Sequence, residues 1–161
     1  TILNAEIFST INDKIMDTLS IQDHESQSIT NPSIVKQIEV ALIKAFKSKK
    51  AFKPNTNKRI NRRLKAFHHP TQVQFEQDYF NRRTVMEISA KDMPGLLSTV
   101  ANVIARNSIN ITHAKVSTLG EKIDDIFYLT NREGSNITKQ STLDKLESQL
   151  ITAIGDMYPS D

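Results

Sequence analysis

The feature that most constrains this chain of 161 residues is a repeat of its own sequence. Residues 2–23 align with residues 111–131, and one extra residue, Phe8, keeps the two copies in phase. The apolar positions that follow stay in phase as well: Val35, Ile38, Leu42 and Ile43 align with Leu143, Leu146, Leu150 and Ile151. Two segments that share their apolar spacing over such a length are expected to build the same supersecondary unit.

Each copy predicts two strands joined by a turn, then a polar loop and a helix. The helices are expected at residues 33–46 and 141–154, where apolar residues recur at i, i+3, i+7 and i+8 as on a core-facing stripe. Pro32 suits the first turn of the earlier helix, because its missing N–H would have no partner there. Ser141 is expected to cap the later helix, with Asp144 three residues further on.

The second copy is preceded by a further strand and helix. Residues 84–90 are strand-like, and residues 94–106 have the apolar spacing of a helix. An added outer strand is expected at residues 73–80, with a turn at 81–83. The first copy holds only the latter half of such a unit, which predicts an open sheet edge and an uncovered apolar helix face. We expect a piece of a longer protein, or completion of the first unit by another chain.

The predicted organisation has three parts: a half unit at residues 1–48, a basic linker at 49–71 and a complete unit at 72–161 with its added hairpin strand. Residues 47–65 hold nine Lys or Arg and no acid, and without them the net charge of +3 becomes −6. The basicity therefore belongs to the linker. A solvated linker is the favoured interpretation, and a patch for nucleic acid or an acidic partner is the alternative.

The turn before the helix at 94–106 contains one of only four glycines in the chain. Glycine weakens the first turn of a helix, so Gly95 needs another explanation. Asp92 is a candidate N-cap, and Pro94 is tolerated in a first turn. Without a Cβ at Gly95, a ligand carboxylate can approach the N–H groups and the positive dipole end of the helix. The alternative, weighed evenly, is a tight corner in which Gly95 packs on its own sheet.

The candidate binding residues come from this turn and from the start of the next strand. That strand start is expected to lie close by and to offer acceptors for the amino group of an α-amino acid. For His113, packing is favoured over ligand contact. The candidate site residues are Asp92, Met93, Pro94, Gly95, Leu96, Asn110 and Ile111.

Two adjacent acids stand in the predicted strand after residue 120. Because neighbours on a strand face opposite sides, Asp124 and Asp125 are not expected to share a metal ion. Asp125 is expected to point inward with Phe127. The open face is expected to carry Ile126 and Tyr128, and this apolar pair predicts an interface with another unit.

Several classes of chemistry are excluded or not indicated by the sequence. The absence of cysteine excludes disulfides, thiolate metal sites and a cysteine nucleophile. No run approaches the roughly 18 apolar residues of a membrane span, and no signal-peptide pattern occurs, so a cytoplasmic location is expected. No phosphate-binding glycine loop, metalloprotease motif or nucleophile elbow is present. We therefore assign no catalytic residue, no metal and no cofactor to this segment.

The motifs of the second unit resemble those of the ACT domain, a small regulatory module that senses amino acids. The family's Asp-x-Pro-Gly-Leu-Leu matches residues 92–97, its Asn-Ile matches 110–111 and its Asp-x-Phe-Tyr matches 125–128. The resemblance covers about 84–156, with the half repeat at 1–48. It implies an α+β fold of ferredoxin-like β-α-β-β-α-β sandwiches, one unit complete and one represented by its latter half.

A narrower resemblance rests on Ser-Thr-Leu-Gly-Glu-Lys at residues 117–122, the basic linker and the added hairpin. These features are similar to the C-terminal tandem of bacterial PII-protein uridylyltransferases, a family that also removes the uridylyl group. The resemblance implies glutamine, or another amino acid, as the ligand of a non-catalytic sensor. It also implies a parent enzyme with upstream catalytic domains, the PII protein as partner, and Mg²⁺ and UTP as reactants there. Pairing of copies through sheet edges is a further expectation, and a membrane partner is not expected.

Two other functions remain open from the residues alone. A nucleic-acid-binding sandwich would use Phe127 and Tyr128 on a central strand, although two acids precede them and the basic-glycine-aromatic pattern is missing. A purely structural dimerisation module would pair through Ile126 and Tyr128.

Overall fold

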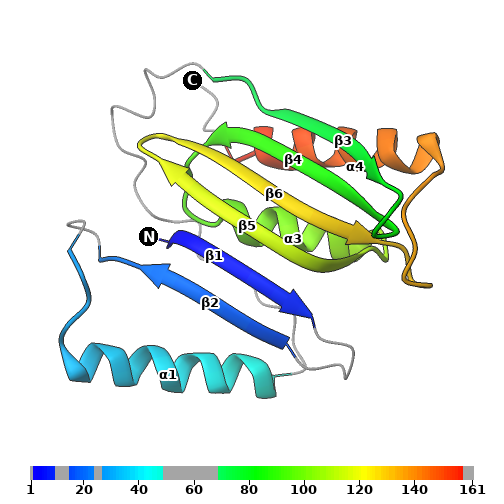
Figure 1. The fold of residues 1–161 in the computed structure, drawn as a ribbon. Coiled ribbons are helices and arrows are strands. Elements are labelled where there is room, and N and C mark those ends of the chain that lie inside the picture. The colour runs from blue at the N-terminus through cyan, green and yellow to red at the C-terminus, as the bar shows by residue number, and fades with distance from the viewer. Residues whose placement is uncertain (1, 10–14, 24–26, 49–68, 158–161) are drawn as a thin grey trace.

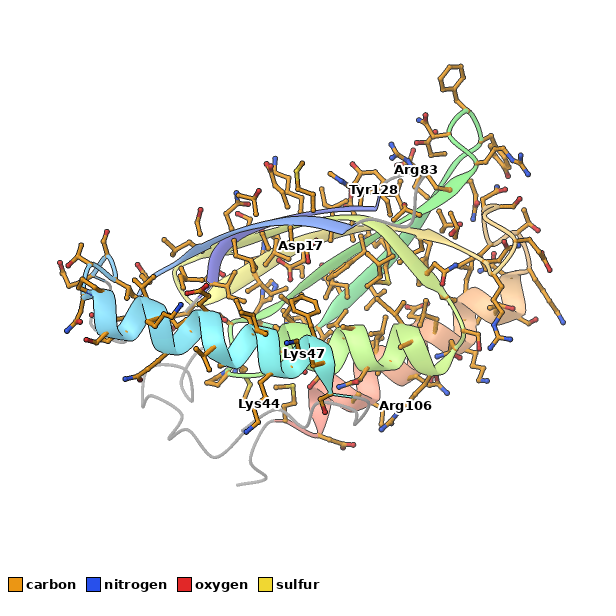
Figure 2. All side chains as sticks on the ribbon, turned by 90° about the horizontal axis from the view of Figure 1, so that it is seen from below. Asp17, Lys44, Lys47, Arg83, Arg106 and Tyr128 are labelled. Atoms are coloured by element: carbon orange, nitrogen blue, oxygen red, sulfur yellow. The ribbon has the colours of Figure 1, made fainter. Side chains whose placement is uncertain are left out.

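A computed structural model describes residues 2–9, 15–23, 27–48 and 69–157. The described residues form one antiparallel six-stranded sheet in the order β2-β1-β5-β6-β4-β3. The helices lie on one face of this sheet and leave the opposite face bare (Figures 1 and 2). This arrangement confirms the predicted α+β class. The strands are β1 (Ile2–Ser9), β2 (Ile15–Ile21), β3 (Gln72–Asp78), β4 (Arg83–Lys91), β5 (Asn110–Leu119) and β6 (Lys122–Thr130), and the helices are α1 (Pro32–Lys47), α3 (Leu96–Arg106) and α4 (Gln140–Gly155).

The hydrophobic core lies between the second unit's strands and the two helices α3 and α4. Alternate residues of β4 and β6 are buried, as expected for strands with one face on a core and the other on solvent. Phe127 of β6 and Met86 of β4 are fully buried at its centre. The helices complete the core with two apolar stripes: Leu96, Val100, Val103 and Ile104 of α3, and Leu143, Leu146, Leu150 and Ile154 of α4.

The added strand β3 pairs with β4 and occupies the outer edge of the sheet. Val73 is buried in the core, and the partly buried Phe75 packs against it. The strand ends at Asp78, two residues earlier than expected, and the exposed Tyr79 and Phe80 belong to the turn. Since this edge strand precedes β4 in the chain, the complete unit reads β-β-α-β-β-α in this structure.

The start of α4 differs from the prediction. Lys139 is the N-cap residue and makes no side-chain capping bond, and Ser141 lies inside the helix. In place of a capping box, the Gln140 amide donates to the Asp144 carboxylate at 2.8 Å. The preceding loop is fixed from the other side, because the backbone N–H of Ile137 donates to the hydroxyl of the fully buried Thr84 at 2.8 Å.

The bounds of the elements bear out the sequence repeat. Helix α1 begins and ends 108 residues before α4. Pro32 occupies the first turn, as predicted, and the Asn31 side chain caps the helix by accepting from the Ser33 N–H at 2.9 Å. The strands β1 and β2 correspond to β5 and β6, at the spacing along the chain that the sequence repeat gives.

The two copies meet through an antiparallel seam between β1 and β5. Glu6 lies opposite Lys115, which is its own counterpart in the repeat. The pairs on either side of it are Ala5↔Val116 and Ile7↔Ala114. Each residue of one pair is the repeat counterpart of a residue of the other pair. The seam therefore has an approximate twofold axis at the Glu6–Lys115 pair, where opposite charges face each other across the strands.

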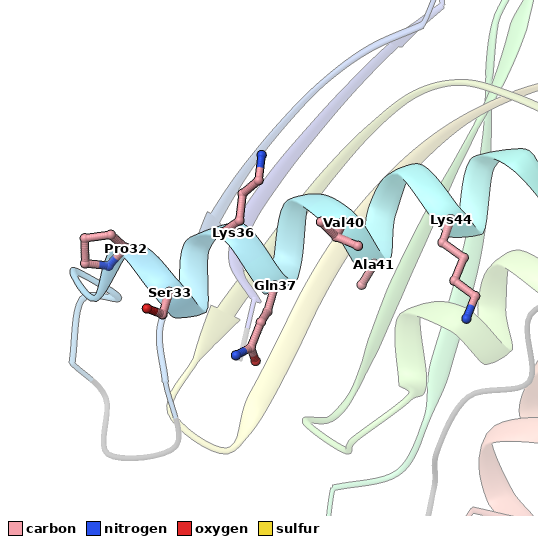
Figure 3. A pocket seen from close by; sticks show the side chains of 7 residues that line it. All are labelled: Pro32, Ser33, Lys36, Gln37, Val40, Ala41 and Lys44. Atoms are coloured by element: carbon pink, nitrogen blue, oxygen red, sulfur yellow. The ribbon is translucent and has the colours of Figure 1, made fainter.

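The first unit is open, as the halved repeat predicts. Strand β2 forms the other edge of the sheet, and α1 lies beyond it in Figure 1. Helix α1 has no buried residue among the described parts of the chain. A groove of about 690 Å³ runs along this helix (Figure 3); it is lined by Pro32, Ser33, Lys36, Gln37, Val40, Ala41 and Lys44.

Candidate functional site

The turn between β4 and α3 is shaped by a left-handed glycine. Gly95 has φ +89° and is the N-cap residue of α3, which begins at Leu96. Side chains other than glycine pay a steric cost in this region, so the conformation itself explains why a glycine stands here. The predictions that α3 begins at Pro94 and that Asp92 caps it are wrong. Among the residues that the structure describes, no side chain caps this helix, and Pro94 lies outside its first turn.

The backbone of the turn leaves donors without protein acceptors. Two carbonyls are engaged: Leu96 N–H donates to Met93 O at 3.0 Å, and Thr99 N–H donates to Gly95 O at 2.9 Å. Within the described residues, the N–H groups of Leu97 and Ser98 have no hydrogen-bond partner. Together with the helix dipole, these donors favour an anion at this end of α3.

Most side chains of the turn face the core. Met93 and Leu96 are buried in the cluster beneath the sheet, so they can offer a ligand little besides backbone. Asp92 is half-buried, and burial raises the pKa of its carboxyl group. Its backbone N–H donates to Glu121 O at 2.9 Å, which ties the turn to the β5–β6 hairpin.

The structure does not bring Asn110 and Ile111 to this turn. Asn110 lies opposite Thr130 at the start of β5, whereas the turn adjoins the far end of β5, near Glu121. The Asn110 side chain instead donates to Asn131 O at 3.4 Å. The expected proximity is wrong because α3 runs back along the sheet, so β5 starts at the opposite end from the turn.

The first unit supplies the strand start that lies near the turn. The Thr118 hydroxyl, close to the end of β5, donates to Ile2 O at 3.1 Å. Ile2 is the repeat counterpart of Ile111, and the seam's approximate twofold carries the start of β1 to this end of the sheet. The candidate site is thus a turn of the second unit next to a strand of the first.

A buried carboxyl group lies on the inner face close to this seam. Asp125 is 3% exposed, and its Oδ1 accepts from the backbone N–H of Ser117 at 3.1 Å. Burial raises its pKa to about 7; the Ser117 N–H acts against this rise, and the charges of Asp92 and Asp124 add to it. The inward orientation was predicted from the alternation of β6, and the burial pattern confirms it.

The bare face of the sheet carries the two predicted interface residues. Ile126 and Tyr128 are half-buried there. The Arg83 guanidinium lies 4.1 Å from the centre of the Tyr128 ring, and the His113 ring lies 5.1 Å from it (Figure 2 labels Arg83 and Tyr128). His113 therefore packs on a side chain, as favoured from the sequence. Phe127 points into the core with no exposure, so it cannot stack on a base as the nucleic-acid hypothesis requires.

The remaining chemistry is sparse in the parts of the chain that the structure describes. They hold no group of three or more acidic or histidine side chains placed to bind a metal ion. His69 makes a 2.8 Å contact with the Ser89 hydroxyl. Of the helices in these parts, none is long and apolar enough to cross a membrane. A second groove, of about 320 Å³, lies between α3 and α4, and neither groove reaches the turn at 92–96.

Comparison with known families identifies the second unit. Residues 84–140 match the ACT domain family. This match covers β4, the glycine turn, α3 and the β5–β6 hairpin. The fold and the sequence match together define this part of the chain as an ACT domain.

Three relatives that this chain is similar to share one name. The chain is similar to the bifunctional uridylyltransferase/uridylyl-removing enzyme of Pseudomonas putida (strain W619), with 29% identity over 98% of this chain and 18% of the relative. The enzymes of that name from Psychrobacter sp. (strain PRwf-1) and Pseudomonas entomophila (strain L48) are 31% and 30% identical over 95% and 92% of this chain, and 17% of each relative. The chain thus spans less than a fifth of the relatives it matches. No solved structure matches it.

Proposed function

We propose that this chain is the regulatory, amino-acid-sensing part of a PII-protein uridylyltransferase, and that L-glutamine is its ligand. The proposal is carried by one observation: the left-handed Gly95 leaves the N–H groups of Leu97 and Ser98 without acceptors beside the seam of the two units. A carboxylate is the group that such a helix start favours. The segment itself is non-catalytic.

The proposed site consists of Asp92, Met93, Pro94, Gly95 and Leu96. In this site the carboxylate of the amino acid approaches the start of α3, and Gly95 provides the space because it has no Cβ. Asn110 and Ile111 are not included, since they lie at the start of β5, at the opposite end of the strand from the turn. The start of β1 takes the place that was expected for them.

The activity proposed for the parent comes from its relatives and the motif resemblance. It transfers UMP from UTP to the PII protein and removes it again, with Mg²⁺, in domains that lie outside this segment. Ligand binding at the seam would change how the two units pair, which gives the parent a signal. A cytoplasmic location and pairing of copies through sheet edges stay predictions.

Calorimetric titration tests the proposed site. L-glutamine is titrated into the chain, with L-glutamate and D-glutamine as controls, and saturable heat is expected from L-glutamine alone. Gly95→Val is expected to abolish this heat, because it fills the approach to the helix start and forces a side chain to positive φ. The matched control is Gly134→Val, at φ +73° in the loop before α4.

The control separates strain from binding. Both substitutions place a β-branched side chain in the left-handed region, at a cost of about 1–2 kcal/mol each. Only the Gly95 variant should lose the ligand. Equal binding by both variants, or no heat from any amino acid with the unaltered chain, would contradict the proposal.

A second candidate function is supported by the bare sheet face. Ile126 and Tyr128 are apolar, only half-buried and central to that face. A module that pairs copies through them would dimerise without a ligand. Sedimentation measures whether the chain and an Ile126→Lys variant are monomers or dimers. A dimer that pairs through this face would be lost in the variant, whereas a dimer that pairs elsewhere would remain.

A further inference from the structure

The Asp125 carboxyl is a buried polar group of the ACT unit in an apolar environment. It lies on the inner face of β6, between Ile123 and Phe127, both in the apolar core. The residue opposite it on the neighbouring strand β4 is Ile88, which is also buried. A carboxylate placed among apolar side chains raises the free energy of the fold unless it is paired. Apolar packing alone therefore does not account for it.

Only one of the two oxygens of this carboxyl accepts a hydrogen bond within the described residues. Backbone pairing of β5 with β6 lapses between Lys115↔Ile126 and Thr118↔Ile123. In this interval the Ser117 N–H donates to Asp125 Oδ1. Among the described residues, Oδ2 has no donor. A carboxylate has room for about four hydrogen bonds, so this buried oxygen is free to take a cationic donor.

The free oxygen lies at the ligand end of the sheet. Asp125 is three residues from Lys122, which pairs with Lys91, the last residue of β4 before the glycine turn. Asp92 in that turn is close enough for its charge to act on Asp125. The N–H donors of Leu97 and Ser98, which have no partner among the described residues, lie in the first turn of α3. Anion donors and an acidic acceptor thus occur at one end of the unit, as a zwitterion requires.

We propose that Asp125 accepts the α-ammonium group of the amino-acid ligand, and that it releases its own proton as the ligand binds. This proposal rests on the amino-acid-sensing function proposed above and deepens it. It places the ammonium subsite on a strand of the core rather than in the turn. Ser117, the other partner of Asp125, faces Asn4 across the seam, so the same group links the ligand to the first unit.

The exchange balances in protons and charge. Without ligand, the buried group is largely protonated below neutral pH, because its pKa is about 7. The incoming ammonium group keeps its three protons and stabilises the carboxylate, so the Asp125 proton passes to solvent. One neutral carboxyl group and one cation become an ion pair and one free proton.

The charges around Asp125 favour this exchange. The two that act on it are the carboxyl groups of Asp92 and Asp124, and both disfavour its ionised form. Asp124 points to the opposite face and is paired with Lys122 at 3.0 Å. The strands β4 and β5 present Ile88 and the Ser117 amide to it. An ammonium ion therefore supplies the countercharge that this environment lacks.

The repeat provides a matched control. Asp17 occupies the position of Asp125 in the first unit, 108 residues earlier. It lies on the same inner face, opposite Ile7, but it is exposed. No glycine turn precedes it in the described part of the first unit. Asp17→Asn thus removes the same chemical group at a position where no ammonium subsite is proposed.

The test is calorimetric titration of the chain with L-glutamine from pH 5.5 to 8.5, at each pH in two buffers that both buffer there and differ in their enthalpy of ionisation. The difference in heat between the two buffers counts the protons released. We expect close to one proton per ligand at pH 5.5 and close to none at pH 8.5, with affinity rising about tenfold per pH unit below the transition. Asp125→Asn should bind L-glutamine about 10- to 100-fold more weakly at pH 8 and release no proton. Asp17→Asn should behave like the unaltered chain.

The outcomes separate this proposal from the one on which it rests. If L-glutamine binds without proton release and Asp125→Asn binds equally well, the ammonium subsite is wrong while amino-acid sensing stands. If neither L-glutamine nor any other amino acid binds the unaltered chain, the sensing function itself fails. The proton count needs no variant, so it decides even if Asp125→Asn does not fold.

Discussion

The two halves of the repeat have the same elements but different interiors. Strands β1 and β2 and helix α1 correspond to β5, β6 and α4 at a nearly constant spacing along the chain. The second unit also has β4, β3 and α3 around these elements, and it has a core. The first unit has no such neighbours in the described residues. An amphipathic helix is therefore encoded locally, whereas its burial depends on the elements beside it.

Corresponding side chains measure this difference. Leu150 of α4 is 0% exposed, and its counterpart Leu42 of α1 is 46% exposed. Ile154 is 0% exposed, and its counterpart Phe46 is 79% exposed. The apolar stripe is present in both helices, so the sequence pattern alone cannot tell which one is covered.

The groove along α1 lies where α3 packs in the second unit. Of the five residues of α4 that line its groove with α3, four have counterparts that line the α1 groove: Lys145, Ser148, Gln149 and Thr152. Subtracting the repeat spacing gives four residues that line the α1 groove: Gln37, Val40, Ala41 and Lys44. The first unit thus presents the surface that a helix like α3 would cover, and Val40 and Ala41 make this surface more apolar than its counterpart.

The largest expected contrast concerns Asp125 and Asp17. The folded chain holds the Asp125 proton up to a pKa of about 7, whereas the unfolded chain loses it near 3.8. Stability should therefore fall as pH rises from about 4 to about 7, and then stay level, with a total loss of about 4 kcal/mol from this group. Asp125→Asn should remove this slope, as measured by urea unfolding at pH 4.5, 6 and 8.

The same measurement on Asp17→Asn sharpens the comparison. Burial also raises the pKa of Asp17, but this side chain is exposed and water screens it. Asp17→Asn should therefore keep most of the slope. An unchanged slope in Asp125→Asn would show that Asp125 is already ionised in the folded chain across this pH range.

The next contrast is between the two helix faces. Leu150→Ala should lower the free energy of unfolding by about 3 kcal/mol, because it removes a fully buried side chain and leaves a cavity. Leu42→Ala should change it by less than about 0.5 kcal/mol, as for an exposed position. Chemical denaturation of the two variants measures both values. A similar loss in the two would mean that α1 is covered in solution.

The sequence predicts the elements of this fold better than their surroundings. The apolar spacing found every described helix, and the repeat anticipated the open edge and the bare face of α1. Helix starts were less predictable. Asp92 and Ser141 are good capping residues by type, but the left-handed Gly95 and the loop bond of Ile137 to Thr84 set where α3 and α4 begin.

The candidate site was only partly accessible to sequence reasoning. The glycine turn could be found because glycine is scarce and a helix start favours an anion. Its partner strand could not, because the seam between β1 and β5 is a long-range pairing that local patterns do not report. Asp125 was predicted to point inward, but the subsite proposed for it rests on the oxygen without a donor and on the interrupted β5–β6 pairing at Ser117, which local patterns do not show.

The smallest expected contrast transfers a cap from one unit to the other. Asn31 and Lys139 are the N-cap residues of α1 and α4, with nearly equal backbone angles: φ −70° and ψ 115°, against φ −76° and ψ 110°. The Asn31 side chain accepts from Ser33 N–H, whereas Lys139 makes no capping bond. Lys139→Asn should therefore let α4 gain the bond that α1 already has, to the N–H of Ser141.

The gain should be about 0.5–1 kcal/mol in the free energy of unfolding, because α4 is packed into the core and its first turn contributes to global stability. Part of it comes from removing a cation beside the positive end of the helix dipole. Lys139→Gln removes the same charge without providing a short capping side chain, so the difference between the two variants measures the cap alone. Equal stabilities would mean that the loop holding Ile137 keeps residue 139 from adopting the geometry of Asn31.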